Sequence, residues 1–427
     1  MDDSVLSSQF LAMHDAFARE GISIEVAYTP SGRADYIYET GRLLARSDQA
    51  QLGQITGALP GAQRISVPGF RKDSPVALLS IDQLDEGHLT VPQALDVIDA
   101  RLHIDGPLSD GFPLVTPVHI MHICQSSPDT TRTCPATEPE VPCCGPDEPC
   151  APCPPCAPSG GGGVSIGICD SGLLQNLTSA SWLNQVTGDP DFLGPALPGG
   201  LSDIPRYCGH GTFVAGVARS QAPDASVYVA KDFTMAGGQR EWVIVQQLEA
   251  LAARQPRPQL VNLSAGTYAR RDWPLLSFLA YEHRDILLTA AAGNDATHRR
   301  FYPAAFRWAI AVGALGADLR NRAWFSNYGD WVDVYTLGEG LVNAYAVGQY
   351  TYLEPPKRPA VQVFDGIARW SGTSFAAPMV AGLIAARMTS KVDAAQARRE
   401  LLDEASRHAI DGLGPVALPW RPPGHGD

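Results

Sequence analysis

Long apolar runs and an excess of positive charge are both missing from this chain of 427 residues. No run of about 18 apolar residues occurs, so no segment is predicted to cross a bilayer as a helix and no membrane partner is expected. Lys and Arg total 32 against 45 Asp and Glu, which argues against a nucleic-acid partner because such proteins carry a basic face. With 45% hydrophobic residues, the composition excludes general disorder.

The beginning of the chain also lacks the marks of a secretory signal peptide. Two Asp residues follow the first Met, without a basic segment or an apolar core after them. We therefore expect a cytoplasmic protein. The net charge of −13 is uneven: residues 1–163 contain 9 basic and 21 acidic side chains, against 23 and 24 in residues 164–427. This asymmetry indicates two parts with different roles.

Residues 1–123 are predicted to form a small α+β domain. Helical spacing of apolar residues predicts a helix that ends at Gly21, a second over 48–58 and a third over 91–102. Alternating apolar residues predict strands at 22–28, 36–38, 43–45, 62–67, 76–81 and 115–123, with a turn at Gly41.

Residues 124–163 differ sharply, with 10 Pro and 7 Cys among 40 residues and four glycines at the end. This composition predicts a linker, stiff in its Pro part and flexible at the glycines. The cysteines have two further interpretations, redox sensing and a metal site, because the spacing C-x2-C occurs twice over 150–156.

From residue 164 to about residue 414, short apolar segments alternate with helical stretches. Strands are predicted at 164–169, 227–230, 260–263, 286–290 and 309–312, with helices such as 242–254 and 273–283. This alternation indicates an α/β domain with a parallel sheet and helices on both faces. Residues 415–427 are predicted to be a C-terminal tail.

Four segments of this domain carry side chains suited to nucleophilic catalysis. They are ICDSG at 168–172, GHGTFVAG at 209–216, AAAGN at 290–294 and SGTSFAAPM at 371–379. A serine hydroxyl needs a base to take its proton and a carboxylate to orient that base. Asp, His and Ser follow one another in the chain order of subtilisin.

These segments resemble those of the subtilisin-like serine proteases, the subtilases, over about residues 164–414. The resemblance implies a subtilisin-like three-layer α/β fold, preceded here by the small α+β domain. It implies a catalytic triad of Asp170, His210 and Ser374, with Asn294 and the Ser374 N–H binding the oxyanion. The substrate-binding residues that it implies are Gly237, Gly238, Ser264, Ala265, Gly266, Ala292 and Gly293.

The function implied is that of a serine endopeptidase acting on a protein or peptide substrate, either many proteins or one partner. The chemistry needs no cofactor, structural calcium is left open, and no metal ligand is assigned. By position, residues 1–123 correspond to the prodomain of subtilases, which predicts an intramolecular inhibitor; a role in binding substrates or partners is the alternative.

Three features leave alternatives open. A non-catalytic or redox-responsive binding module on a subtilase scaffold is the rival function. Cys169 and Cys208, beside the triad, are either a redox- or metal-sensitive pair or two small buried side chains. The insertion at 335–367 either shapes the substrate cleft or is a decorative hairpin.

Overall fold

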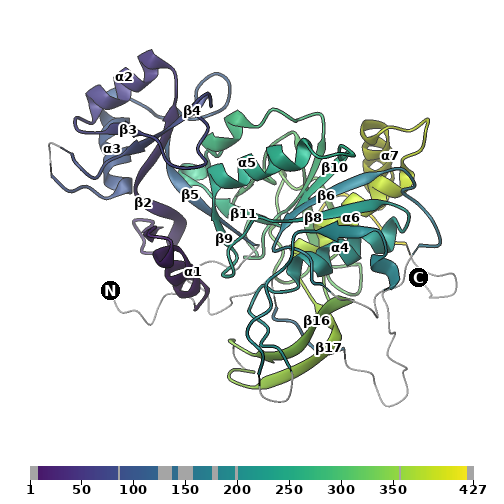
Figure 1. Ribbon diagram of the computed structural model, residues 1–427. Helices are drawn as coiled ribbons and strands as arrows, with labels where there is room; N and C mark the ends of the chain where they lie inside the picture. The colour runs from purple at the N-terminus through teal and green to yellow at the C-terminus, as the bar shows by residue number, and fades with distance from the viewer. Residues whose placement is uncertain are drawn as a thin grey trace.

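A central parallel sheet, a smaller N-terminal unit and a projecting hairpin make up the computed structural model (Figure 1). The structure describes residues 8–84, 87–123, 137–142, 157–175, 181–197, 201–354 and 357–420. The seven cysteines of the predicted linker all lie outside the described residues, and so does most of the predicted C-terminal tail.

Seven parallel strands form the central sheet, in the order β15-β14-β12-β10-β6-β8-β7. They are β6 (Ser165–Asp170), β7 (Val186–Gly188), β8 (Ser226–Lys231), β10 (Leu260–Leu263), β12 (Leu287–Ala291), β14 (Ala309–Leu315) and β15 (Val334–Leu337). The five strands predicted in this region all occur. The parallel arrangement that their spacing predicted is confirmed.

Helices cover both faces of this sheet. They are α4 (His210–Gln221), α5 (Glu241–Ala252), α6 (Thr373–Arg387) and α7 (Ala394–Arg407). On one face α4 and α6 pack on Ile166 and Ile168 of β6, and on the other face α5 packs near Cys169. Successive side chains of a strand point to opposite faces, so this almost wholly apolar strand serves both cores. The three-layer α/β fold is thus as predicted.

The N-terminal unit combines helices with an antiparallel sheet. Its elements are α1 (Ser8–Arg19), β1 (Ile24–Tyr28), β2 (Ala34–Arg46), α2 (Gln49–Ala58), β3 (Gln63–Ile65), β4 (Val76–Ser80), α3 (Val91–Leu102) and β5 (Val115–Ile123). Thr90 caps α3 in a capping box with Gln93, which fixes the start of that helix. The turn predicted at Gly41 is wrong: Gly41 has φ +67° inside one continuous strand, β2, and the pairing of β2 with β5 shifts there.

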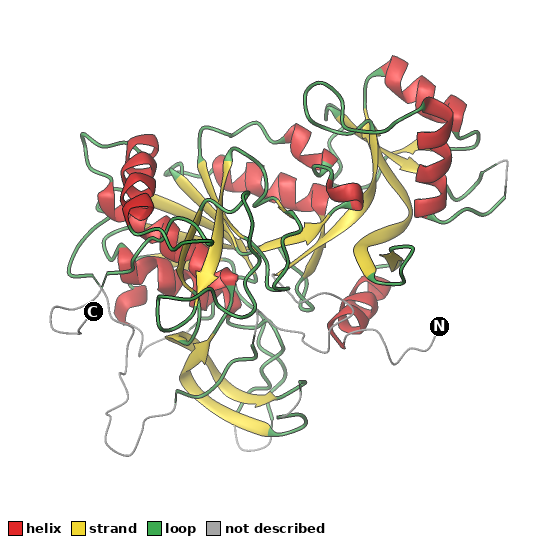
Figure 2. Cartoon of the chain, turned by 180° about the vertical axis from the view of Figure 1, so that it is seen from behind, coloured by secondary structure: helices red, strands yellow, loops and turns green. Residues whose placement is uncertain are grey.

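Strand β5 continues the N-terminal sheet into the central domain. The combined sheet has the order β13-β11-β5-β2-β4-β3, with β9 also paired to β5. The added strands are β9 (Gly238–Arg240), β11 (Ala265–Tyr268) and β13 (Phe301–Tyr302). All nine residues of β5 are buried, and seen from behind the sheet runs without a break between the two units (Figure 2).

The insertion is a long antiparallel hairpin of β16 (Leu341–Thr351) and β17 (Val361–Trp370). Its tip projects away from the sheet (Figure 1), whereas Tyr345 and Trp370 near its base join the core around α4. Residues 137–142, part of the predicted linker, lie against this hairpin, and the Glu140 and Arg369 backbones exchange hydrogen bonds of 2.9 and 2.7 Å.

One predicted helix, at 273–283, is absent. Trp273 is extended with ψ 151° and precedes Pro274, which disfavours helical backbone at the residue before it. Only short 3₁₀ turns form here, η3 (Arg270–Asp272) and η4 (Leu276–Ala280); another, η2 (Ser181–Leu183), precedes β7. Within the described ranges, no helix has the length and apolar character needed to cross a membrane.

Candidate active site

Asp170 and His210 meet at the carboxyl end of the parallel sheet. Strand β6 ends at Asp170 and helix α4 begins at His210. Nδ1 of His210 lies 2.7 Å from Oδ1 of Asp170, and the two residues are 0% and 1% exposed. A carboxylate at this distance orients the imidazole and favours the tautomer that carries its proton on Nδ1.

Gly211 allows helix α4 to approach β6 so closely. A β-carbon at Gly211 would lie 2.5 Å from the carbonyl oxygen of Gly172 and 3.2 Å from Cβ of Asp170. Only a residue without a β-carbon fits there. The second glycine of the GHG segment is therefore required by packing.

Asp191, which the sequence analysis did not select, supports the same corner. Its Oδ2 accepts hydrogen bonds from the Ser171 hydroxyl at 3.0 Å and the Gly209 N–H at 2.7 Å. The Ser171 hydroxyl in turn accepts from the Gly211 N–H at 3.1 Å. Burial raises the pKa of Asp191 to about 6. An acidic residue in a loop gives no sequence signal of this role.

Ser374 lies in the first turn of helix α6. Pro378 has no N–H to donate to the carbonyl four residues earlier, which is that of Ser374. This carbonyl instead accepts from the Ser264 hydroxyl at 2.6 Å, and the Ser374 hydroxyl donates to the carbonyl of Ser264 at 3.3 Å. The nucleophile candidate is therefore tied to the segment predicted to bind substrate.

His210 and the start of α6 pack together through aromatic contacts. The His210 ring lies 5.4 Å from the ring of Phe375 and 5.5 Å from that of Trp370, measured between centroids. Nε2 of His210 has no hydrogen-bond partner among the described residues. The residue after Ser374 thus contacts His210, while the serine–histidine hydrogen bond is not formed; such bonds often tighten only when substrate binds.

Asn294 lies beside the same helix start. Its Oδ1 accepts from the N–H of Thr373 at 3.0 Å and from the Thr373 hydroxyl at 2.9 Å. These two contacts fix the orientation of the amide. Because the oxygen is directed at Thr373, the amide NH₂ group of Asn294 is the end of the side chain that could donate to an oxyanion.

The predicted substrate-binding segments flank strand β5. Gly238 pairs with His122, and the carbonyl of Gly237 accepts from the Ile123 N–H at 2.9 Å. On the other side Gly266 pairs with His122 and Ala265 with Ile123. The end of the N-terminal unit therefore lies, as an antiparallel strand, between the two segments expected to hold substrate.

Ala292 and Gly293 form a second wall of the predicted substrate-binding region, and Asn327 holds them in place. The Asn327 side chain donates to the Ala292 carbonyl at 2.8 Å and to the Tyr268 hydroxyl at 3.0 Å. Its oxygen accepts from the N–H of Asp295 at 3.0 Å. The sequence analysis did not assign a role in the site to Asn327.

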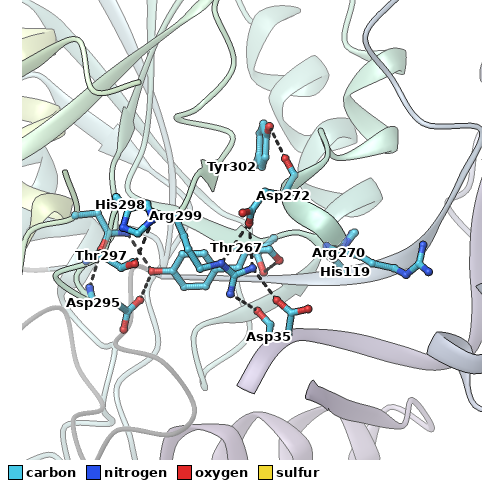
Figure 3. Close-up of polar contacts among 12 residues, drawn as sticks. Asp35, His119, Thr267, Arg270, Asp272, Asp295, Thr297, His298, Arg299 and Tyr302 are labelled. Carbon is cyan, nitrogen blue, oxygen red and sulfur yellow. Dashed lines mark hydrogen bonds and ion pairs between the residues drawn. The ribbon is translucent and has the colours of Figure 1, made fainter. Parts of the chain in front are cut away.

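Ion pairs join the N-terminal unit to this region, and Figure 3 shows the one between Arg299 and Asp35. The guanidinium of Arg299 lies 2.7 Å from Asp35 of the N-terminal unit. Arg270, which follows β11, lies 2.8 Å from Asp99 of α3, and both residues are buried. Because Arg270 and Asp99 are withdrawn from water, separating the two units would leave buried charges without partners.

A buried histidine–glutamate contact lies between these pairs and the cleft. Nδ1 of His119 in β5 is 2.8 Å from Oε1 of Glu241, at the start of α5. Nε2 of His119 accepts from the N–H of Arg270 at 3.2 Å. The Ser277 hydroxyl donates to Glu241 at 2.6 Å. His119 of β5 thus links the N-terminal unit to α5 and to the segment after β11.

Cys169 and Cys208 are both buried, with free thiols. Burial is the main cause that raises the pKa of each thiol far above its usual value. A thiol held protonated in this way is a poor nucleophile, which favours the interpretation as small buried side chains. Among the described residues no group of three or more His, Cys, Asp or Glu could hold a metal ion, and calcium stays an untested prediction.

Comparison with known proteins places these features in a family. The profile of the subtilase family matches residues 161–413. A subtilisin-like protease of Coccidioides posadasii is 29% identical over 241 residues, 52% of this chain and 55% of its own length. An intracellular serine protease of Paenibacillus polymyxa is 31% identical over 196 residues, 42% of this chain and 53% of its own. The chain thus spans about half the length of the curated relatives it matches.

A solved structure shares this fold. Fervidolysin from Fervidobacterium pennivorans, a keratinolytic enzyme related to subtilisin, superposes with a TM-score of 0.55 at 18% identity, covering 90% of this chain and 60% of that one. The matched profile covers more than half of this chain and includes all four motif segments, with the fold expected of them. The chain therefore belongs to the subtilase family.

Proposed function

We propose that this chain is a serine endopeptidase in which Asp170, His210 and Ser374 form the catalytic triad. The observation that carries the proposal is the 2.7 Å contact between Asp170 and the otherwise unpartnered, buried imidazole of His210, packed against the turn that holds Ser374. A buried imidazole oriented by a carboxylate beside a helix-start serine is the arrangement that activates a hydroxyl.

In the proposed reaction, the Ser374 hydroxyl leaves the Ser264 carbonyl and turns to Nε2 of His210. His210 takes the hydroxyl proton as Ser374 attacks the substrate carbonyl, and then returns it to the leaving amine. Asp170 stabilises the imidazolium, while Asn294 and the Ser374 N–H donate to the oxyanion. Water then hydrolyses the acyl-enzyme, and no step needs a cofactor.

We propose further that residues 1–123 are the intramolecular inhibitor of this site. Strand β5 occupies both backbone edges, at Gly238 and at Gly266, to which a substrate strand would bind. Its last residue, Ile123, pairs with Ala265, next to the Ser264 carbonyl that contacts Ser374. This supports cleavage of the chain shortly after Ile123, with the N-terminal unit left bound in the cleft.

The sequence-based boundaries at 123, 163 and 414 remain proposals. Because residues 137–142 pack on the hairpin, we propose that this part of the linker stays with the catalytic domain after cleavage. The expected cytoplasmic location also stays a prediction.

The test uses a fluorophosphonate probe on the full chain, on a chain that begins at Gln125, and on Ser374→Ala in both forms. We expect strong labelling of the shorter chain, weak labelling of the full chain and none of the Ser374→Ala variants. In subtilisin, loss of the serine or histidine lowers kcat by about 10⁶-fold, so residual activity in Ser374→Ala would refute the triad.

The other results separate the remaining alternatives. Equal labelling of both forms would assign residues 1–123 to binding substrates or partners instead of inhibition. Failure of a chain shown to be folded by circular dichroism to label at all would favour the non-catalytic binding module. Mass spectrometry of the full chain, compared with its Ser374→Ala variant, locates the cleavage site.

A further inference from the structure

The ring of Phe301 stands between the two walls of the proposed substrate cleft. Phe301 lies in β13 and pairs with Tyr268 of β11. A β-carbon at Gly266, on one wall, would lie 2.4 Å from Cε1 of Phe301. A β-carbon at Gly293, on the other wall, would lie 3.2 Å from its Cγ. The ring therefore fills the space between these two glycines.

The ring is held firmly in this position. Phe301 is completely buried, and its ring packs edge-on against the ring of Tyr268 at 5.1 Å. The Tyr268 hydroxyl donates to Asp295 and accepts from Asn327. The guanidinium of Arg299 lies 4.7 Å from the centre of the Tyr268 ring. The Tyr268 ring against which Phe301 packs is therefore itself held by three partners, and a rotation of Phe301 out of the cleft would lose this ring contact.

The register of β5 shows which substrate side chain meets this ring. His122 pairs with Gly266, and its ring lies 5.9 Å from that of Phe301. Side chains two residues apart on a strand point to the same face. A substrate strand in this register therefore directs toward Phe301 the side chain that lies opposite Ser264, whose carbonyl contacts Ser374. Because the hydroxyl of Ser374, the proposed nucleophile, lies at this point of the strand, that residue is the one immediately before the bond to be cleaved.

We infer that Phe301 restricts this substrate position to small side chains: glycine, alanine, serine or cysteine. The inference rests on the proposed endopeptidase function and deepens it by naming the substrate class. A larger side chain would have to displace a ring already in contact with both walls, and overpacking of this kind is costly. The sequence of the chain fits this limit, since the residue that follows Ile123 is Cys124.

The test measures kcat/KM of the full chain, after self-processing and release of residues 1–123, on fluorogenic peptides Ile-Met-His-Ile-X, which copy residues 120–123. The leaving group follows X, and X is alanine, serine, leucine or phenylalanine. Active sites are counted with the fluorophosphonate probe, which carries no such side chain. We expect alanine and serine to exceed phenylalanine by about 100-fold, the range that pocket size can supply.

Variants of Phe301 identify the cause. Phe301→Ala, with Phe301→Leu as a milder second variant, should raise cleavage after phenylalanine and reduce the preference to within about tenfold. Phe306→Ala is the matched control, because Phe306 is a buried aromatic of the same region that contacts Tyr302 but neither glycine wall. It should lower stability and leave the preference unchanged.

The outcomes distinguish the two levels of the argument. A wild-type enzyme that labels with the probe and cleaves after phenylalanine or leucine as fast as after alanine would overturn this inference and leave the proposed function intact. Absence of both labelling and turnover would refute the proposed function and this inference with it.

Discussion

Buried carboxyl groups surround the Asp170–His210 pair. Asp232, whose N–H donates to the Asp170 carbonyl, is buried next to the Cys169 thiol, and burial raises its pKa to about 7. Burial likewise raises the pKa of Asp191 to about 6. Asp232 and, to a smaller extent, Asp191 are therefore partly protonated near neutral pH. Their protonation limits the negative charge around the imidazole.

Replacement of Asp170 tests the role of the carboxylate. Asp170→Asn should lower kcat by about 10⁴-fold, because an amide cannot hold the tautomer and orientation that the carboxylate imposes. The matched control is Asp232→Asn, a buried carboxyl that does not contact His210, and it should change kcat by less than about threefold. Steady-state kinetics of both variants in the chain that begins at Gln125, with thermal melting to confirm folding, is the measurement; equal losses would contradict this role.

At the scale of elements, the hairpin provides the surface on which residues 137–142 pack. Glu138 is 6% exposed and accepts from the Tyr350 hydroxyl at 2.9 Å and from the N–H groups of Leu353 and Glu354 at 2.8 and 3.2 Å. Trp370 donates to the Thr137 carbonyl at 2.7 Å. These contacts give the insertion a structural role and argue against a purely decorative hairpin.

Removal of the Glu138 carboxylate tests this role. Glu138→Ala takes the acceptor from three partly buried donors and should lower the free energy of unfolding by about 2–4 kcal/mol. Glu140→Ala is the control: Glu140 pairs with Lys357 and Arg369 but is one-third exposed in its side chain, so the cost should stay below about 1 kcal/mol. Urea unfolding in the Ser374→Ala background avoids self-digestion; similar losses for the two variants would contradict the prediction.

At the scale of the whole molecule, contacts of β5 and ion pairs of Arg270, Arg271 and Arg299 connect the N-terminal unit to the catalytic domain. The buried position of His122 adds a dependence on pH. Burial lowers the pKa of His122 to about 4, below its value near 6.5 in water. The released strand therefore binds a proton that the docked strand excludes, and docking is fully stable only above about pH 6.5.

Release of the processed N-terminal unit should consequently increase as the pH falls from about 6.5 toward 4, at a cost to docking of up to about 1.4 kcal/mol per pH unit. Size-exclusion chromatography of the processed chain at pH 7.5 and pH 5 is the measurement. His122→Leu should reduce the pH dependence of release, and substitution of the exposed His88 by Leu should not. A released fraction that is the same at both pH values would contradict the prediction.

Local sequence signals were sufficient for most elements of the fold. The apolar spacing over residues 91–102 predicted α3, and the apolar run before Asp170 predicted β6 with that carboxylate at its end. Where prediction was wrong, a local signal was overridden or overlooked: Gly41 suggested a turn but lies within β2, and Pro274 excludes the helix that the apolar residues after it suggested.

The sequence by itself determined the subtilase fold and the candidates Asp170, His210, Asn294 and Ser374, because their short motifs combine a strand end or helix start with the reactive side chain. Only the tertiary structure decided that β5 lies between Gly238 and Gly266, and that Phe301 closes the space between Gly266 and Gly293. The physical reason is that strand register and side-chain packing depend on segments far apart in the chain, whose meeting no local pattern records.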